Sequence, residues 1–419
     1  MKYEYIIVGA GIAGITIAEL LQRSGKKVLL IEKNRRVCSC ATAEQHGWFH
    51  TGSLYASLPT NKYFKAMVSN LDNIRNFYSG FQNMNLDFKN TIKSNNKYGW
   101  FQQNHNYYLY ASPLDKTIPL LVKLIWKLAI IRAKSRLAWF ETLDFEKELQ
   151  SQIVRNIFNF SLGNRKREAI LKLDLHKFVK TSEVLRSQDR GMNSNIIISD
   201  LLNSFAFCGG DLLLENEVVK IKSGMVYTEN KSYNSSQVIV TSGKNIEQLT
   251  NLKVRIVKSP MLVVKPAITN INFIIMHPKM NNTLNHIYHN TEFGDYSLFG
   301  NAIYYDSEKE IDSMRIKLEM VKKVNSIFST SIDHSTSSLY WGYKTEVQRL
   351  GLIRNYQYNI HDLGDYIVAL PGKMTLAFSL AVSLCKYLKV SPTKEIQLCN
   401  KYSYDNVFEA THFKKYLEL

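Results

Sequence analysis

Cysteine is scarce in this sequence, and no pair of cysteines is spaced to bind a metal. The five cysteines form neither a C-x-x-C pair nor the ligand spacing of a zinc site. We therefore expect reduced thiols in a cytoplasmic protein, and no metal site. Internal repeats and low-complexity tracts are also absent. The N-terminus leads directly into a strand-like run, so we expect no signal peptide.

A hydrophobic run that is long and uncharged enough to span a membrane is missing as well. The most apolar stretch, residues 117–140 (TIPLLVKLIWKLAIIRAKSRLAWF), is interrupted by Lys and Arg. Its large aliphatic residues share one helical face, and its basic residues lie mostly elsewhere. Such a helix either packs on its own protein or lies on an anionic membrane. Residues 117–140 are therefore a candidate for peripheral membrane contact on the cytoplasmic face.

Acidic residues are outnumbered by basic ones, 36 to 53, which gives a formal net charge of +17. The basic residues are spread along the chain and form neither a basic block nor an RNA-binding signature. This distribution indicates a general attraction to anions, such as a small anionic substrate or a membrane surface. It does not favour nucleic-acid binding, and it leaves the oligomeric state open.

The strongest motif lies in the first thirty residues. Residues 3–8 form an apolar run suited to a buried strand, and G-x-G-x-x-G follows where a helix over residues 12–24 begins. Gly9 permits a tight turn, and Gly11 lets the backbone approach a diphosphate. Gly14 lets the helix pack closely on the strand. The N–H groups at the start of this helix would bind the diphosphate.

An acidic residue completes this dinucleotide-binding motif. Glu32 follows the second strand, residues 28–31. A carboxylate at this position would accept a hydrogen bond from a hydroxyl of an unphosphorylated ribose. The place of the motif near the start of the chain favours FAD over NAD. The contacts predicted from this stretch are Gly9, Ala10, Gly11, Ile12, Ala13, Gly14, Glu32 and Lys33.

Later segments are predicted to meet the same cofactor. Small residues at Thr42 and Ala43 would let the chain pass it closely, and Val218 lies on a strand near the adenine. A buried strand over residues 237–241 ends at Ser242 and Gly243. The stretch DYIVALPGKMTLAFSLA predicts a strand, a turn and a helix, which is a second anion-binding arrangement. Its predicted contacts are Gly372, Lys373, Met374 and Thr375.

Together these motifs resemble those of the D-amino-acid-oxidase-like FAD oxidoreductases, which include glycine oxidase, sarcosine oxidase, glycerol-3-phosphate dehydrogenase and L-2-hydroxyglutarate dehydrogenase. VGAGIAG with Glu32 matches the nucleotide-binding motif, and EVVKI followed by VIVTSG is similar to a second FAD-contacting strand pair. FHTGSLY is similar to I-H-G-G-L-R-Y of the glycerol-3-phosphate enzymes, and PGKMTLAFSLA resembles their G-G-K-x-T-T segment. The resemblance covers roughly half of the chain, nearly all of it cofactor-binding.

The resemblance implies an α/β fold, α+β overall, in which a Rossmann-like FAD-binding domain is interleaved with an antiparallel-sheet substrate domain. A length of 419 residues agrees with two intertwined domains. We expect strands over residues 254–264, 273–276 and 303–305 to form an antiparallel sheet that covers one face of the flavin ring. The predicted FAD-binding domain is 1–60, 190–250 and 350–390, the substrate domain is 61–189 and 251–349, and 391–419 form a C-terminal tail.

The resemblance also assigns roles to individual residues. It places His50 and Tyr55 at the substrate pocket near flavin N5, and Lys373 and Thr375 at the flavin O2 or N1 edge. The arginine of the glycerol-3-phosphate pattern is Leu54 here, which argues against that substrate. A carboxylate-binding residue is sought among Lys344, Arg349 and Arg354.

The first hypothesis for function is an FAD-dependent dehydrogenase or oxidase that oxidises a CH–OH or CH–NH group of a small polar substrate by hydride transfer to flavin N5. His50 would be the base, Tyr55 a substrate hydrogen-bond partner, and Lys373 a stabiliser of the reduced flavin. A flavin monooxygenase, halogenase or prenyl reductase is the alternative, although the G-D-A-A-H type of segment is missing. A third hypothesis is a non-catalytic FAD-binding protein whose partner surface lies in residues 62–190.

Overall fold

The computed structural model describes residues 2–78, 81–82, 84–85, 93–94, 100–102, 106–112, 116–143, 181–291, 294–328, 331–347, 357–391 and 396–397. Arg349, Arg354 and almost all of the predicted C-terminal tail lie outside these ranges. Among the described helices, none is both long and apolar enough to cross a membrane.

The first of two large sheets has a parallel centre. Its strands β10 (Asp211–Leu213), β2 (Val28–Ile31), β1 (Lys2–Val8), β13 (Ser232–Val240) and β21 (Ile367–Leu370) lie side by side in this order, all parallel. The hairpin of β11 (Val218–Lys222) and β12 (Met225–Thr228) extends the sheet from β13, and β20 (Asn359–Asp362) pairs with β21. All four residues of β2 are buried, as expected of a strand covered on both faces.

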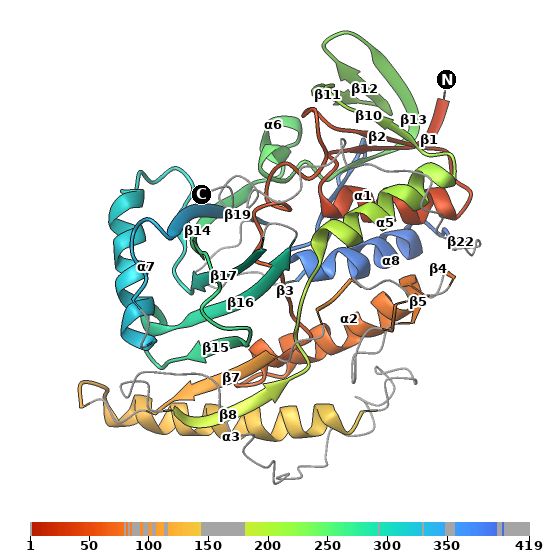
Figure 1. Ribbon diagram of the computed structural model, residues 1–419. Helices are drawn as coiled ribbons and strands as arrows, with labels where there is room; N and C mark the ends of the chain where they lie inside the picture. The colour runs from red at the N-terminus through yellow and green to blue at the C-terminus, as the bar shows by residue number, and fades with distance from the viewer. Residues whose placement is uncertain are drawn as a thin grey trace.

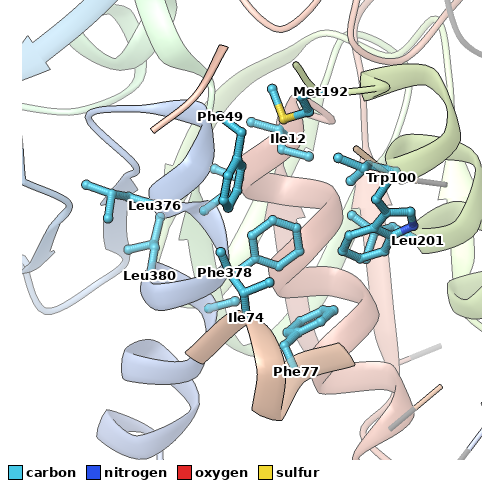
Figure 2. Close-up of a cluster of buried hydrophobic side chains, with 14 of the residues drawn as sticks. Ile12, Phe49, Ile74, Phe77, Trp100, Met192, Leu201, Leu376, Phe378 and Leu380 are labelled. Carbon is cyan, nitrogen blue, oxygen red and sulfur yellow. The ribbon is translucent and has the colours of Figure 1, made fainter. Parts of the chain in front are cut away.

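Helices cover one face of this sheet and create the largest core. Helix α1 (Ile12–Arg23) packs between α5 (Ser194–Phe207) and α8 (Ala377–Tyr387), and α2 (Lys62–Tyr78) lies against α8 (Figure 1). Trp100 stacks on Phe378 with ring centres 5.5 Å apart, and Phe77 meets the same ring edge-on at 5.2 Å (Figure 2). This aromatic packing holds α2 against α8. The N-terminal ends of α1 and α8 face the site described below.

The second large sheet is mainly antiparallel. Its order is β18 (Tyr305–Asp306), β14 (Val254–Val264), β17 (Gly294–Asn301), β16 (Leu284–Thr291), β15 (Asn272–Met276), β7 (Asn106–Ala111) and β8 (Thr181–Ser187), with β19 (Ser337–Val347) along β14. Only the β15–β7 pair of this sheet is parallel in the described chain. Helix α7 (Ser313–Ile327) packs on β14 and β19, while α3 (Leu120–Glu141) lies along β8 at the outer side (Figure 1).

The predicted fold class is confirmed, including the interleaving of the two sheets along the chain. The strands predicted over 254–264 and 273–276 are present, but the third begins only at Tyr305, and β16 and β17 precede it. The short elements are β3 (Trp48–Phe49), η1 (Ser53–Tyr55), β4 (Phe81–Gln82), β5 (Met84–Asn85), β6 (Lys93–Ser94), β9 (Arg190–Gly191), η2 (Gly243–Asn245), α6 (Ile246–Leu249), η3 (Met280–Asn282), η4 (Met374–Leu376) and β22 (Ile396–Gln397).

Candidate active site

A cavity of 280 Å³ opens at the carboxyl ends of the parallel strands. Val8, Ile31, Thr241 and Leu370, which end or follow β1, β2, β13 and β21, all line it. The second sheet closes the cavity with residues of β14 and β19. In open α/β sheets, ligands bind at the carboxyl ends of the parallel strands. The binding position is the point where the connections from neighbouring strands run to opposite faces of the sheet. The fold thus brings segments from the beginning, middle and end of the chain to one place.

The three glycines of the first turn meet different surroundings. Gly9 has a φ of +102°, and a Cβ on it would lie 2.9 Å from Cα of Ser242. A Cβ on Gly14 would lie 1.9 Å from the carbonyl oxygen of Gly9, so the helix could not pack on the turn with any side chain there. A Cβ on Gly11 would meet only the hydroxyl of Thr42, at 3.4 Å. Gly11 lines the cavity, and the protein itself leaves room for a methyl group there.

Glu32 holds this turn against the end of β2. One carboxylate oxygen accepts a hydrogen bond from the backbone N–H of Ala10 at 2.8 Å, and the other accepts from the backbone and side chain of Asn34. Thr42 accepts from the backbone N–H of Ile12 at 3.1 Å, in the first turn of α1. Glu32 and Thr42 therefore organise the turn and at the same time line the cavity.

The structure brings most of the predicted cofactor contacts together. Those that line the cavity are Gly9, Gly11, Ile12, Ala13, Glu32, Lys33, Thr42, Val218, Ser242, Gly243, Gly372, Lys373, Met374 and Thr375. Ala10, Gly14 and Ala43 are not among the lining residues. Within the described chain, the hydroxyls of Ser242 and Thr375 are buried and have no hydrogen-bond partner. Buried polar groups are nearly always paired, so two such hydroxyls in a cavity wall indicate a polar ligand.

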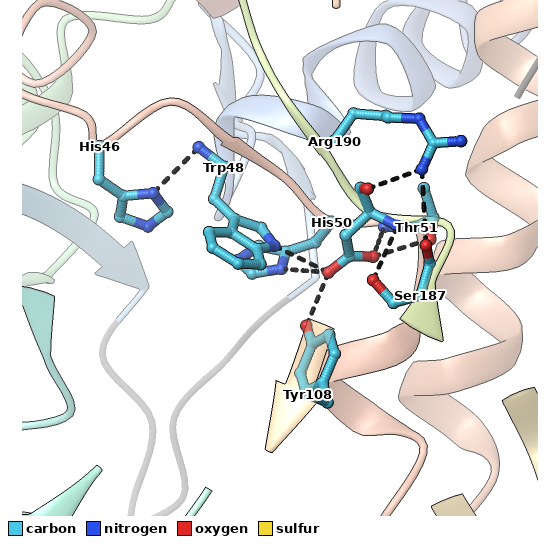
Figure 3. Close-up of polar contacts among 8 residues, drawn as sticks. His46, Trp48, His50, Thr51, Tyr108, Ser187 and Arg190 are labelled. Carbon is cyan, nitrogen blue, oxygen red and sulfur yellow. Dashed lines mark hydrogen bonds and ion pairs between the residues drawn. The ribbon is translucent and has the colours of Figure 1, made fainter. Parts of the chain in front are cut away.

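Asp189 forms a buried anionic centre next to His50, which lines the cavity, and Figure 3 shows the surrounding polar contacts of Trp48, His50, Thr51 and Tyr108. Its carboxylate accepts hydrogen bonds from the backbone and hydroxyl of Thr51, both at 2.8 Å, and from the indole of Trp48 at 2.8 Å. Tyr108 donates at 2.7 Å, and His50 Nδ1 lies at 3.2 Å. Burial by itself would raise the pKa of Asp189, but the hydrogen bonds from His50, Tyr108 and Trp48 hold it far below its ordinary value. Asp189 is therefore ionised at neutral pH.

His50 lies between this carboxylate and the cavity, which it lines. Burial, and after it the charge of Lys373, lower the pKa of His50 to about 4, because the hydrogen bond and charge of Asp189 offset these two effects only in part. The imidazole is therefore neutral at neutral pH. Because Asp189 can only accept, Nδ1 of His50 carries the proton and Nε2 carries the lone pair. His50 consequently has the tautomer of a general base.

His46 has the opposite tautomer. Its Nδ1 accepts a hydrogen bond from the backbone N–H of Trp48 at 3.0 Å, so in the neutral ring Nε2 carries the proton. Burial holds its pKa well below the ordinary value, with further lowering by Lys344, His50 and Lys373. The rings of His46 and His50 are 6.1 Å apart, and both line the cavity. Together they offer one hydrogen-bond donor and one acceptor.

Four lysines line the same cavity: Lys33, Lys244, Lys344 and Lys373. Lys373 Nζ lies 5.2 Å from the centre of the Tyr55 ring, and Lys344 donates to the hydroxyl of Tyr304 at 3.2 Å. Tyr55, which was predicted to lie at the substrate pocket, is buried and is not among the lining residues; its ring contacts Lys373 instead. Three carboxylates, those of Glu32, Glu44 and Glu217, also line the cavity, so its wall carries one net positive charge, which suits an anionic ligand.

Sequence reasoning did not find Asp189, Trp48 or Tyr108 as parts of the site. Asp189 lies in a short turn between β8 and β9, and nothing in SQDRG distinguishes it from a solvated turn residue. The burial of that turn beneath His50 depends on the pairing of β3 with β9, which the sequence pattern did not predict.

Comparisons with known proteins agree with this arrangement. A family model described as an NAD(P)-binding Rossmann-like domain matches residues 7–79, and no curated protein matches the chain. Glycine oxidase from Geobacillus kaustophilus superimposes with a TM-score of 0.63 at 12% identity, over 96% of this chain and 100% of that one. L-alpha-glycerophosphate oxidase from Mycoplasma pneumoniae, with FAD bound, gives 0.63 at 14% identity, over 96% and 98% of the two chains.

This chain has the fold of the FAD-dependent oxidoreductases. L-proline dehydrogenase from P. horikoshii shares this fold as well, with a TM-score of 0.61 at 13% identity, over 93% of this chain and 94% of that one. The fold expected from the motifs is thereby confirmed. Because the matches cover both chains almost fully, the flavoprotein fold extends over the substrate-side sheet, where the sequence showed no resemblance.

Proposed function

We propose that this protein is an FAD-dependent oxidoreductase that oxidises a CH–OH or CH–NH group of a small, polar, anionic substrate. The observation that carries the proposal is one cavity whose wall includes both a dinucleotide-binding turn and the neutral His50 held by Asp189. A binding turn alone would fit many proteins, but a histidine with a fixed tautomer in the same cavity supplies a base.

The residues present fit FAD. The N-terminal end of α1 and Gly11 would hold the diphosphate, and Glu32 would hold the adenosine ribose. The hydroxyls of Ser242 and Thr375, which have no hydrogen-bond partner in the described chain, would form hydrogen bonds with the cofactor. Bound FAD would supply a hydride acceptor at N5. Lys373, at the turn before η4, would stabilise negative charge on the reduced ring.

The protein's own side chains would then handle the proton and the charge of the substrate. His50 Nε2 would take the proton from the substrate hydroxyl or amine, and the ionised Asp189 would stabilise the imidazolium that forms. His46 Nε2–H would donate to a second oxygen of the substrate, and Lys344 would attract its negative charge. Tyr55 would position Lys373 through the ring contact.

The test begins with the visible spectrum of the purified protein, which is expected to show bound FAD. Anaerobic titration with hydroxy acids, amino acids, polyol phosphates and sugar derivatives is then expected to bleach the flavin with one class of donor. Failure to bind FAD would overturn the proposal. Bleaching by NADPH or NADH alone would favour the monooxygenase type of enzyme, and a flavin that no donor reduces would favour a non-catalytic FAD-binding protein.

The charge of Lys373 is expected to control the pH dependence of the reaction. His50 must be neutral to act as a base, so the rate of flavin reduction falls as the pH drops through its pKa, about 4. The substitution Lys373→Met removes a positive charge that lowers this pKa, so the acidic limb should move to higher pH, by roughly one unit. Stopped-flow reduction across the pH range measures the shift. Lys244→Met, which removes a lysine from the same cavity that is not a cause of the His50 shift, is the control.

A further inference from the structure

The outward face of α3 carries an unusual density of exposed apolar side chains. Seven of the fifteen large hydrophobic residues exposed in the described chain lie between Leu120 and Ile131. Leu120 is 74% exposed and Leu121 is 68% exposed. Contiguous apolar surface of this kind marks an interaction site, whereas scattered exposed residues do not. The apolar face consists of Leu120, Leu121, Val122, Leu124, Ile125, Leu128 and Ile131.

The opposite side of α3 is firmly attached to the protein. Ala133 and Leu137 are buried, and the indole of Trp126 donates to the carbonyl oxygen of Ala111 in β7 at 2.9 Å. Arg136 donates to the carbonyl oxygens of Ala56 and Leu58 at 2.9 and 2.6 Å. Figure 1 shows α3 along the outer side of the molecule, beyond β7 and β8. The apolar face is therefore a fixed outer surface of the folded protein.

The charged side chains of α3 and of the turn before it that lie beside the apolar face are all basic. Lys116 and Lys127 are exposed, Lys123 is partly exposed, and no acidic residue occurs from Lys116 to Phe140. Lys279 places a further positive charge beside the start of α3. Its Nζ donates a hydrogen bond of 2.6 Å to the hydroxyl of Thr117, which lies just before the helix. Apolar side chains flanked by lysines match the interface of an anionic bilayer, where the leucines enter the acyl boundary and the lysines meet phosphate groups.

We propose that α3 docks this protein on the surface of anionic phospholipid membranes. The exposed segment from Leu120 to Ile131 is roughly 18 Å long as a helix, so it would lie in the interface and not span the bilayer. The charge of the whole chain, +17, supports the same partner and opposes pairing of this face with a second copy.

Sedimentation with lipid vesicles tests this proposal on the full-length protein. Vesicles of phosphatidylglycerol mixed with phosphatidylcholine are compared with pure phosphatidylcholine vesicles, at low and high salt. We expect binding to the anionic vesicles, weakened by salt. The double substitution Leu124→Glu with Leu128→Glu should reduce the affinity at least about tenfold, because it places charge in the apolar face.

A matched control lies on α7, where Met314 and Leu318 are 51% and 52% exposed. Met314→Glu with Leu318→Glu makes the same change in charge and should keep vesicle binding near that of the wild type. Circular dichroism and thermal unfolding confirm that both variants fold. Three results would overturn the proposal: no binding of the wild-type protein, equal loss in both variants, or a dimer of the free protein that only the α3 variant abolishes.

Discussion

Replacing Asp189 with Asn is expected to slow flavin reduction by substrate roughly 10²–10⁴-fold, about as much as replacing His50 with Ala. The amide would turn an N–H toward His50, which would then hold its proton on Nε2 and could no longer accept one. His50→Ala removes the base directly. Rapid mixing of each variant with substrate in the absence of oxygen measures the effect.

Three controls make this prediction specific. Both variants should retain FAD; equal loss of FAD binding and of reduction would make His50 structural. His50→Ala should unfold near the temperature of the wild-type protein, whereas Asp189→Asn turns an N–H toward the indole N–H of Trp48 and should be destabilised by about 1–3 kcal/mol. The double variant should be no slower than either single one, because the two residues act as a unit. Tyr108→Phe removes one donor to Asp189 but leaves the His50 tautomer unchanged, so its rate should fall less than about tenfold.

Two glycines in the same turn are expected to respond differently to alanine. Gly14→Ala places a Cβ 1.9 Å from the carbonyl oxygen of Gly9 and should destabilise the protein by about 3 kcal/mol or more. Gly11→Ala has a permitted backbone conformation, with φ of −76°, and its Cβ would point to space that the protein does not fill. It should therefore fold normally and bind FAD at least about tenfold more weakly.

Thermal unfolding and fluorescence titration with FAD separate the two effects. Wild-type affinity in Gly11→Ala would mean that the diphosphate does not pass this turn. Wild-type stability in Gly14→Ala would mean that the helix can move away from the strand without cost.

The parts of the fold that the sequence predicted are those with local signals. The turn at Gly9, the helix that follows it and the strand end at Glu32 each have a pattern within a few neighbouring residues. The hairpin of β16 and β17 was missed because polar residues occupy buried positions. His286 Nε2 lies 2.8 Å from the hydroxyl of Ser297 inside this hairpin, which hides the apolar alternation typical of a strand.

The candidate site was predicted only where its residues lie in motifs. His50 follows from the resemblance of FHTGSLY, but Asp189 is 139 residues further along the chain and has no motif of its own. Its role arises from tertiary burial, which gathers Thr51, Trp48 and Tyr108 around one carboxylate. The exposure of the α3 leucines is likewise a tertiary result, because the same stripe would serve equally well as an internal contact.

The order of strands in the parallel sheet has a consequence for synthesis of the protein. β1 pairs with β13, and β13 in turn pairs with β21, so the sheet is incomplete until residues 367–370 have been made. A nascent chain on the ribosome can form the glycine turn early, yet it lacks the wall at Gly372 and Lys373 until that point. Stable loading of the proposed dinucleotide would therefore be a late event in biogenesis, and chains truncated before β21 should be recovered without it.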